Sequence, residues 1–234
     1  MTYPDLANIV WHSLNGAHSA FGLGTATARR YAPGFPPLVA FADPQRPDLA
    51  ALEPLCAPGE HLYCGGWSGP VPAGWRLDAD ELACQMVWQG EPPEADEALP
   101  AVPLKAEHAP AAQALVGLTQ PGPFGERSLE LGQYFGVFDA GRLVAMAGER
   151  FRTGELVEVS AVCTHPDYQG RGLARRLIER LVQAQLARGQ TPFLHVIHAN
   201  AGAFRLYQRM GFMACCDLAV RVVSRLPRDS PRAP

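Results

Sequence analysis

The chain has 234 residues, of which 47% are hydrophobic, and it carries a formal net charge of −3 with an isoelectric point near 6.2. This composition is typical of a globular protein with a hydrophobic core, and it offers no basic field for binding nucleic acid. No apolar run approaches the ~18 residues that cross a membrane, and no charged segment followed by an apolar one opens the chain. We therefore expect a cytoplasmic protein that binds neither nucleic acid nor membranes.

The first hundred residues are predicted to form a smaller α/β domain. An acidic, proline-containing stretch at residues 91–97 is typical of a linker, and it places the boundary near residue 100. Gly22-Leu23-Gly24 is interpreted as a glycine turn between helices, because no strand is predicted before it. Hydrophobic spacing predicts helices at 4–14 and 48–55 and strands at 38–42, 61–64, 75–77 and 83–88.

Residues 101–226 are predicted to form a second α/β domain around a mixed central sheet flanked by helices. Asp139-Ala140-Gly141 is a hairpin signal between two apolar runs, and residues 227–234 are predicted to be a flexible tail. The remaining elements, in chain order, are a helix ending at 118, a rigid loop at 121–125, strands at 134–138, 143–150 and 156–164, a helix from about 173, a strand at 192–197, a helix at 200–210, and closing strands at 212–216 and 218–224.

The segment from Glu158 to Leu181 predicts a strand, an anion-binding loop and a helix. Leu173, Leu177 and Leu181 fall on one stripe of that helix. Backbone N–H groups in the first turn of a helix have no intrahelical partner, so together with the helix dipole they can bind a phosphate or pyrophosphate. The loop matches neither a Walker sequence nor a dinucleotide fingerprint. The loop matches the pattern [Q/R]-x-x-G-x-[G/A] at Gln169, Gly172 and Ala174.

A second motif follows at residues 193–212, F-L-H-V-x-x-x-N-x-x-A-x-x-L-Y-x-x-x-G-F. Asn200, Ala203 and Tyr207 share one face of its helix. With V-C-T-H-P-D-Y-Q-G-R-G-L-A before it, the sequence from about 104 to 224 resembles the GNAT superfamily of acetyl-CoA-dependent N-acetyltransferases. The first hundred residues are interpreted as a degenerate GNAT-like half that helps enclose the substrate.

The resemblance implies that acetyl-CoA is the co-substrate and that this region holds it. In the family the main strand splays from its neighbour, and its unpaired backbone groups hold the pantetheine arm. Asn200 could hydrogen-bond the same arm, cap the following helix, or do both. The implied coenzyme-binding residues are Val162, Cys163, Thr164, Gln169, Gly170, Arg171, Gly172, Leu173, Ala174, Asn200 and Ala203.

Two residues are predicted to take part in catalysis, Tyr207 and Glu158. A phenol is protonated at neutral pH and can donate to the departing thiolate, so Tyr207 is the predicted general acid; the alternative is a core aromatic residue. Strand alternation puts Glu158, Ser160 and Val162 on one face, and Val159 and Cys163 on the other. Glu158 is the predicted base, with a water relay or a solvent-facing strand glutamate as the alternatives.

These features predict a direct transfer of acetyl from the coenzyme to the amine of a small molecule or amino acid. A coenzyme-binding sensor without turnover and a transferase for longer acyl groups stay open as alternatives. No metal is expected, because His195 and His198 have no nearby cysteine partner and are interpreted as structural or cleft-lining. The six cysteines contain no C-x-x-C pair and are expected to be reduced thiols.

Overall fold

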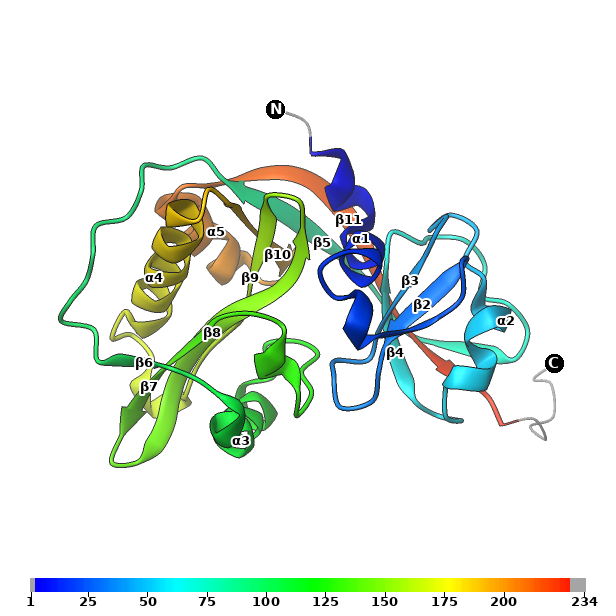
Figure 1. Ribbon diagram of the computed structural model, residues 1–234, viewed down its shortest axis with the longest axis horizontal. Helices are drawn as coiled ribbons and strands as arrows, with labels where there is room; N and C mark the ends of the chain where they lie inside the picture. Colours follow the sequence, from blue (N-terminus) through cyan, green and yellow to red (C-terminus); the bar gives the residue numbers. More distant parts are fainter. Residues whose placement is uncertain (1–2, 228–234) are drawn as a thin grey trace.

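Eleven strands form one continuous, curved sheet in the computed structural model, which describes residues 3–227 (Figure 1). The sheet is mixed: β3 pairs with β4 and β9 with β10 in parallel, and the other pairs are antiparallel. The strand order is β1-β2-β3-β4-β11-β5-β10-β9-β8-β7-β6. The strands are β1 (Gly22–Gly24), β2 (Ala28–Tyr31), β3 (Leu38–Phe41), β4 (His61–Gly65), β5 (Trp75–Trp88), β6 (Ala101–Pro103), β7 (Tyr134–Asp139), β8 (Arg142–Thr153), β9 (Leu156–Thr164), β10 (Thr191–Ile197) and β11 (Phe212–Arg225).

Helices cover this sheet, which confirms the predicted α/β class with a mixed central sheet. In Figure 1, α4 and α5 lie at one end of the molecule, α2 at the other, and α1 between them. The helices are α1 (Ile9–Asn15), α2 (Leu49–Leu52), α3 (Ala109–Thr119), α4 (Leu173–Ala187) and α5 (Ala201–Met210).

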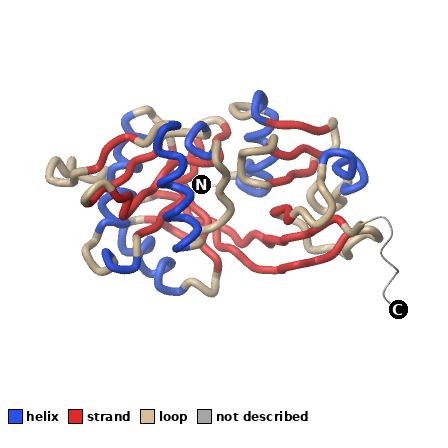
Figure 2. The backbone as a smooth tube through the Cα atoms, turned by 90° about the horizontal axis from the view of Figure 1, so that it is seen from below, coloured by secondary structure: helices blue, strands red, loops and turns tan. Residues whose placement is uncertain are grey.

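The long strands β5 and β11 join the two lobes of the molecule. Figure 2 shows both strands running along the underside from one lobe to the other. β5 lies between β11 and β10, so a strand from the first hundred residues sits in the middle of the sheet. The division into residues 1–100 and 101–226 stays a prediction, and the sheet itself crosses residue 100.

A shared hydrophobic cluster fixes how the two lobes sit against each other. Leu6, Ile9 and Leu14, at and before α1, are fully buried. They pack in one cluster with Leu156 of β9 and Phe193 of β10. Burying each such side chain contributes about 1.5–3 kcal/mol. The N-terminal lobe is therefore anchored directly on the strands that build the site described below.

The structure corrects three sequence predictions. Segments 75–77 and 83–88 belong to the single strand β5. Segments 212–216 and 218–224 belong to the single strand β11, because a bulge at Cys215 shifts the register without ending the pairing. The predicted turn at Gly22-Leu23-Gly24 is the strand β1, paired with β2. A Cβ on Gly24 would lie 2.2 Å from the carbonyl oxygen of Ala28, so this glycine permits a close approach of two backbones.

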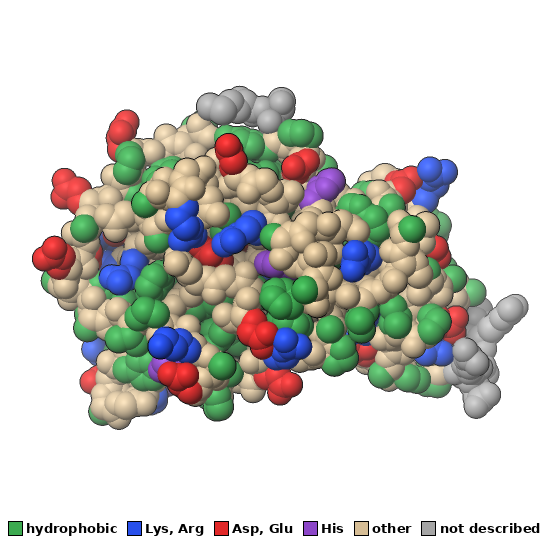
Figure 3. Space-filling model, in the orientation of Figure 1, with side chains coloured by type: hydrophobic (Ala, Val, Ile, Leu, Met, Phe, Trp, Pro, Cys, Tyr) green, Lys and Arg blue, Asp and Glu red, His purple; other side chains and the backbone are tan. Residues whose placement is uncertain are grey.

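Charged side chains of both signs are scattered over the face seen in Figure 3, without a large patch of one sign. Within residues 3–227, no helix is long and apolar enough to cross a membrane. The predicted flexible tail at 227–234 lies outside the described residues, apart from Pro227.

Candidate functional site

A wedge opens between β9 and β10. The two strands pair in parallel only at their beginnings, where Thr191 to Phe193 lie opposite Leu156 to Glu158. Beyond that point β10 continues alongside β5, and β9 continues alongside β8. The backbone groups of β9 that follow Glu158 therefore have no strand partner on the β10 side in the described sheet.

A β-bulge at Ala161 reorients the end of β9. Ala161 has a φ of 51°, which is unusual for a residue with a side chain, and the β8–β9 register jumps between Ser160 and Cys163. Val159 packs in the cluster formed with α4, whereas Cys163 packs in the cluster formed with α3. The predicted shared face of Val159 and Cys163 is therefore wrong, because the extra residue reverses the alternation.

A cavity of about 660 Å³ lies at the wedge. Both lobes contribute to its wall, with Tyr63, Cys64 and Gly65 of β4 opposite the strands of the C-terminal lobe. The predicted residues that line it are Glu158, Val162, Cys163, Thr164, Gln169, Asn200, Ala203 and Tyr207. Gly170, Arg171, Gly172, Leu173 and Ala174 do not line the cavity and follow Gln169 in the chain to begin α4.

The loop before α4 presents uncapped backbone N–H groups. Gly170 and Gly172 have φ values of 75° and 74°, and no side chain caps the helix. Arg171 donates to the carbonyl oxygen of Asp167 at 3.0 Å, and its guanidinium carbon lies 4.4 Å from the centre of the Tyr168 ring. This loop fits a pyrophosphate group, because oriented N–H groups, a helix dipole and a fixed arginine meet there.

Replacing Gly172 with alanine is expected to weaken acetyl-CoA binding about tenfold. A Cβ there would meet no atom within 4 Å, so the cost comes from the left-handed backbone, roughly 1–2 kcal/mol. Calorimetric titration with acetyl-CoA measures the change. Gly117→Ala is the matched control, since Gly117 lies within α3 with equally open surroundings and no positive φ. Equal affinities for the Gly172 variant and the wild type would contradict the prediction.

Asn200 and Tyr207 occupy one wall of the cavity. The Oδ1 atom of Asn200 accepts from the backbone N–H of Ala203 at 3.1 Å, so Asn200 caps α5. Tyr207 is half-buried two turns further along, with its ring edge against Phe212. Burial raises the pKa of Tyr207 to about 12, so the phenol stays protonated at neutral pH.

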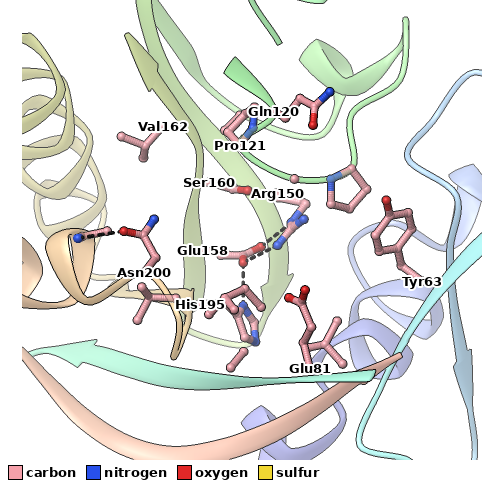
Figure 4. A pocket seen from close by; sticks show the side chains of 18 of the residues that line it. Tyr63, Glu81, Gln120, Pro121, Arg150, Glu158, Ser160, Val162, His195 and Asn200 are labelled. Atoms are coloured by element: carbon pink, nitrogen blue, oxygen red, sulfur yellow. Dashed lines mark hydrogen bonds and ion pairs between the residues drawn. The ribbon is translucent and has the colours of Figure 1, made fainter. Parts of the chain in front are cut away.

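Glu158 is buried within a network of hydrogen bonds, which excludes a solvent-facing position. Its two carboxylate oxygens accept from Nε and Nη2 of Arg150, both at 2.8 Å, and Oε1 lies 2.6 Å from Nδ1 of His195 (Figure 4). Burial by itself would raise the pKa of Glu158, but Arg150 and then His195 outweigh it and lower that pKa to about 2. The carboxylate is therefore ionised and weakly basic, and its role as the base stays a prediction.

His195 lines the cavity, as the sequence suggested. Its Nε2 atom lies 2.9 Å from Nε2 of Gln85, whose amide also donates to the carbonyl of Leu6 and accepts from the thiol of Cys216. These contacts orient the Gln85 amide, so the imidazole accepts at Nε2 and carries its proton on Nδ1, toward Glu158. The imidazole thus lies between the Gln85 amide and the Glu158 carboxylate.

The stability that Glu158 contributes is expected to depend on pH. Its pKa is about 2 when folded and near 4.5 when unfolded, so the contribution is complete above pH 4.5 and is lost as the pH falls toward 2. The gap in unfolding free energy between the wild type and Glu158→Gln should lose roughly half its size by about pH 3. Denaturant titrations at several pH values measure this gap, and a gap unchanged at pH 3 would contradict the assignment.

The residues of the cavity wall that sequence reasoning missed include Tyr63, Glu81 and Arg150. Arg150 could have been found, because a glutamate in a predicted central strand needs a cation and Arg150 lies in the preceding strand of the same meander. Tyr63 and Glu81 carry no comparable signal, since their approach depends on the pairing of distant strands. No group of three or more potential metal ligands occurs within residues 3–227.

Comparisons with known proteins identify the family. A family model described as FR47-like protein matches residues 134–222. The crystal structure of a GNAT-family acetyltransferase from Novosphingobium aromaticivorans has 36% sequence identity and a TM-score of 0.86, and the match covers 95% of this chain and 99% of that chain. The structure of a GCN5-related N-acetyltransferase from Kribbella flavida has 17% sequence identity and a TM-score of 0.64, and the match covers 94% of this chain and 95% of that chain. At this identity the match shows a similar fold alone.

A shorter match links the chain to N-alpha-acetyltransferase RimI of Mycobacterium tuberculosis. The two are 39% identical over 83 residues, which is 34% of this chain and 51% of the relative. The chain therefore matches about half the length of that curated protein. Taken with the near-complete coverage of the Novosphingobium structure, these similarities show that the chain belongs to the GNAT family of acetyltransferases.

Proposed function

We propose that the protein transfers an acetyl group directly from acetyl-CoA to the amine of a small molecule or amino acid. The observation that carries this proposal is the wedge between β9 and β10, which opens onto a cavity lined by Val162, Asn200 and Tyr207. Family membership supports acetyl transfer in general. The acceptor and the roles of individual residues are our assignments.

The polar groups that line the wedge fit the coenzyme. On the side that faces β10, the backbone of β9 from Val162 to Thr164 has no strand partner and offers hydrogen bonds to a pantetheine amide. The buried hydroxyl of Thr164 has no partner within the described residues. Gln169 to Ala174 would hold the pyrophosphate, and Asn200 and Ala203 would flank the arm. Bound acetyl-CoA supplies the activated thioester, so the protein needs no covalent nucleophile.

The reaction requires a neutral amine. Its nitrogen attacks the thioester carbon, the C–S bond breaks, and the proton lost by the nitrogen ends on the coenzyme sulfur. A phenol of pKa about 12 is a weaker acid than a thiol, near 8.5. Tyr207 would therefore stabilise the departing sulfur by hydrogen bonding, and would regain from the amine any proton it gives. One backbone N–H of Val162 to Thr164 would polarise the carbonyl.

Glu158 would act on the nitrogen. Positive charge develops on the amine as it attacks, and a buried carboxylate in the same cavity stabilises that charge. Because the pKa of Glu158 is about 2, proton removal would pass through water rather than rest on the carboxylate.

Thiol release tests this function. The protein is mixed with acetyl-CoA and a panel of amines, including a peptide α-amine because the curated relative is an N-alpha-acetyltransferase. Amine-dependent release of CoA with formation of the matching acetamide supports the proposal. Acetyl-CoA binding without release from any amine would favour a sensor, and faster release from longer acyl-CoAs would favour a different acyl donor.

A further inference from the structure

The cavity has two chemically different ends, and the assignment of its far end rests on the proposed function. In Figure 4, Val162 and Asn200 lie on one side, Tyr63 and Glu81 lie on the other, and Glu158 stands between them. The first side belongs to the wedge that would take the coenzyme. The acceptor must therefore reach the thioester from the side of Tyr63 and Glu81.

Glu81 gives this far end an unbalanced negative charge. Arg150 and Glu158 cancel each other through their paired hydrogen bonds, and His195 is engaged with Glu158 and Gln85. Glu81, exposed on β5, also lines the cavity and has no ion-pair partner within the described residues. A negatively charged acceptor would therefore meet repulsion here, and Arg150 is already committed to Glu158.

Apolar side chains lie beside Tyr63 and Glu81 at the far end of the cavity. Leu38 of β3 and Val220 and Val222 of β11 form part of the wall near Tyr63. Such a wall suits a short hydrocarbon chain, because water leaves the apolar surfaces when they meet. The far end thus combines an aliphatic path with a single carboxylate at its side.

We propose that the acceptor is an aliphatic diamine, or a closely similar primary amine with a second positive charge, and that Glu81 binds the second ammonium group. The reacting nitrogen is neutral near Glu158, while the distant nitrogen keeps its proton and pairs with Glu81. Glu81 acts as a specificity determinant and takes no part in proton transfer. Since Glu81 is exposed, the ion pair favours the charged acceptor by about twofold to fivefold.

A matched pair of acceptors tests the inference. 1,4-Diaminobutane and butylamine share an aliphatic chain and differ in the second charge. The wild type should use the diamine with a kcat/KM about twofold to fivefold higher. Glu81→Gln should remove that preference by raising the KM for the diamine, with kcat changed less than about twofold. Glu81→Asp should keep part of the preference, and Glu91→Gln, exposed and outside the cavity wall, should keep all of it.

Calorimetric titration of the diamine into the CoA-bound protein separates this inference from the proposed function. Weaker diamine binding to Glu81→Gln than to the wild type supports the role of Glu81, even if no amine releases thiol and the transfer reaction fails. A diamine preference that survives in Glu81→Gln would overturn the inference. So would faster turnover of butylamine, or of an acceptor with a carboxylate in place of the second ammonium.

Discussion

Replacing Glu158 with glutamine is expected to lower the free energy of unfolding by about 3–5 kcal/mol. The change leaves the guanidinium of Arg150 in a buried position without its counter-charge, and the amide cannot accept from Nε, Nη2 and His195 together. For a chain of this size the melting temperature should fall by roughly 10 °C. Denaturant titration followed by circular dichroism measures the change.

A double variant separates the lost charge pair from lost packing. Arg150→Met with Glu158→Leu replaces both charges with apolar side chains of similar length, which is often neutral for a buried ion pair. We expect this protein to be more stable than Glu158→Gln alone. Wild-type stability in the single variant would show that Arg150 and Glu158 do not depend on each other.

Replacing Tyr207 with phenylalanine is expected to lower kcat about 100-fold and to leave the KM for acetyl-CoA nearly unchanged. The ring keeps its contact with Phe212, so only the hydroxyl of this cavity-lining residue is lost. Steady-state thiol release with a saturating amine measures the effect.

Tyr3→Phe provides the matched control, because Tyr3 lies outside the cavity wall. It should retain the wild-type kcat. If Tyr207→Phe also retained the wild-type kcat with an intact melting temperature, Tyr207 would be a packing residue and the departing sulfur would take its proton from another donor.

The wedge side of the cavity was predictable because its signals are local. The loop that starts at Gln169 and the capped helix that starts after Asn200 each depend on residues a few positions apart, and Gln169 and Asn200 both line the cavity. The coenzyme-binding role of these residues stays a prediction. The spacing of hydrophobic residues also predicted the buried face of α4, on which Leu177 and Leu181 are fully buried.

The side of the cavity that holds Tyr63 and Glu81 was not predictable, because it depends on pairing between distant segments. β5 reaches the centre of the sheet through β10 and β11, more than a hundred residues later, and this places Glu81 in the cavity. The bulge at Ala161 likewise is not marked by a residue typical of turns. Simple alternation along the strand therefore assigned Cys163 to the wrong face of β9. The spacing of hydrophobic residues predicts which face of a helix or strand is buried, but it does not predict which strands pair with each other.

Isothermal titration of the purified protein with acetyl-CoA is the most direct measurement. The wedge between β9 and β10, together with the uncapped start of α4, predicts saturable binding at one site per chain, and CoA should bind at the same site. The absence of any binding of acetyl-CoA or CoA would contradict the use of this wedge as a coenzyme site, and with it the proposed transfer reaction.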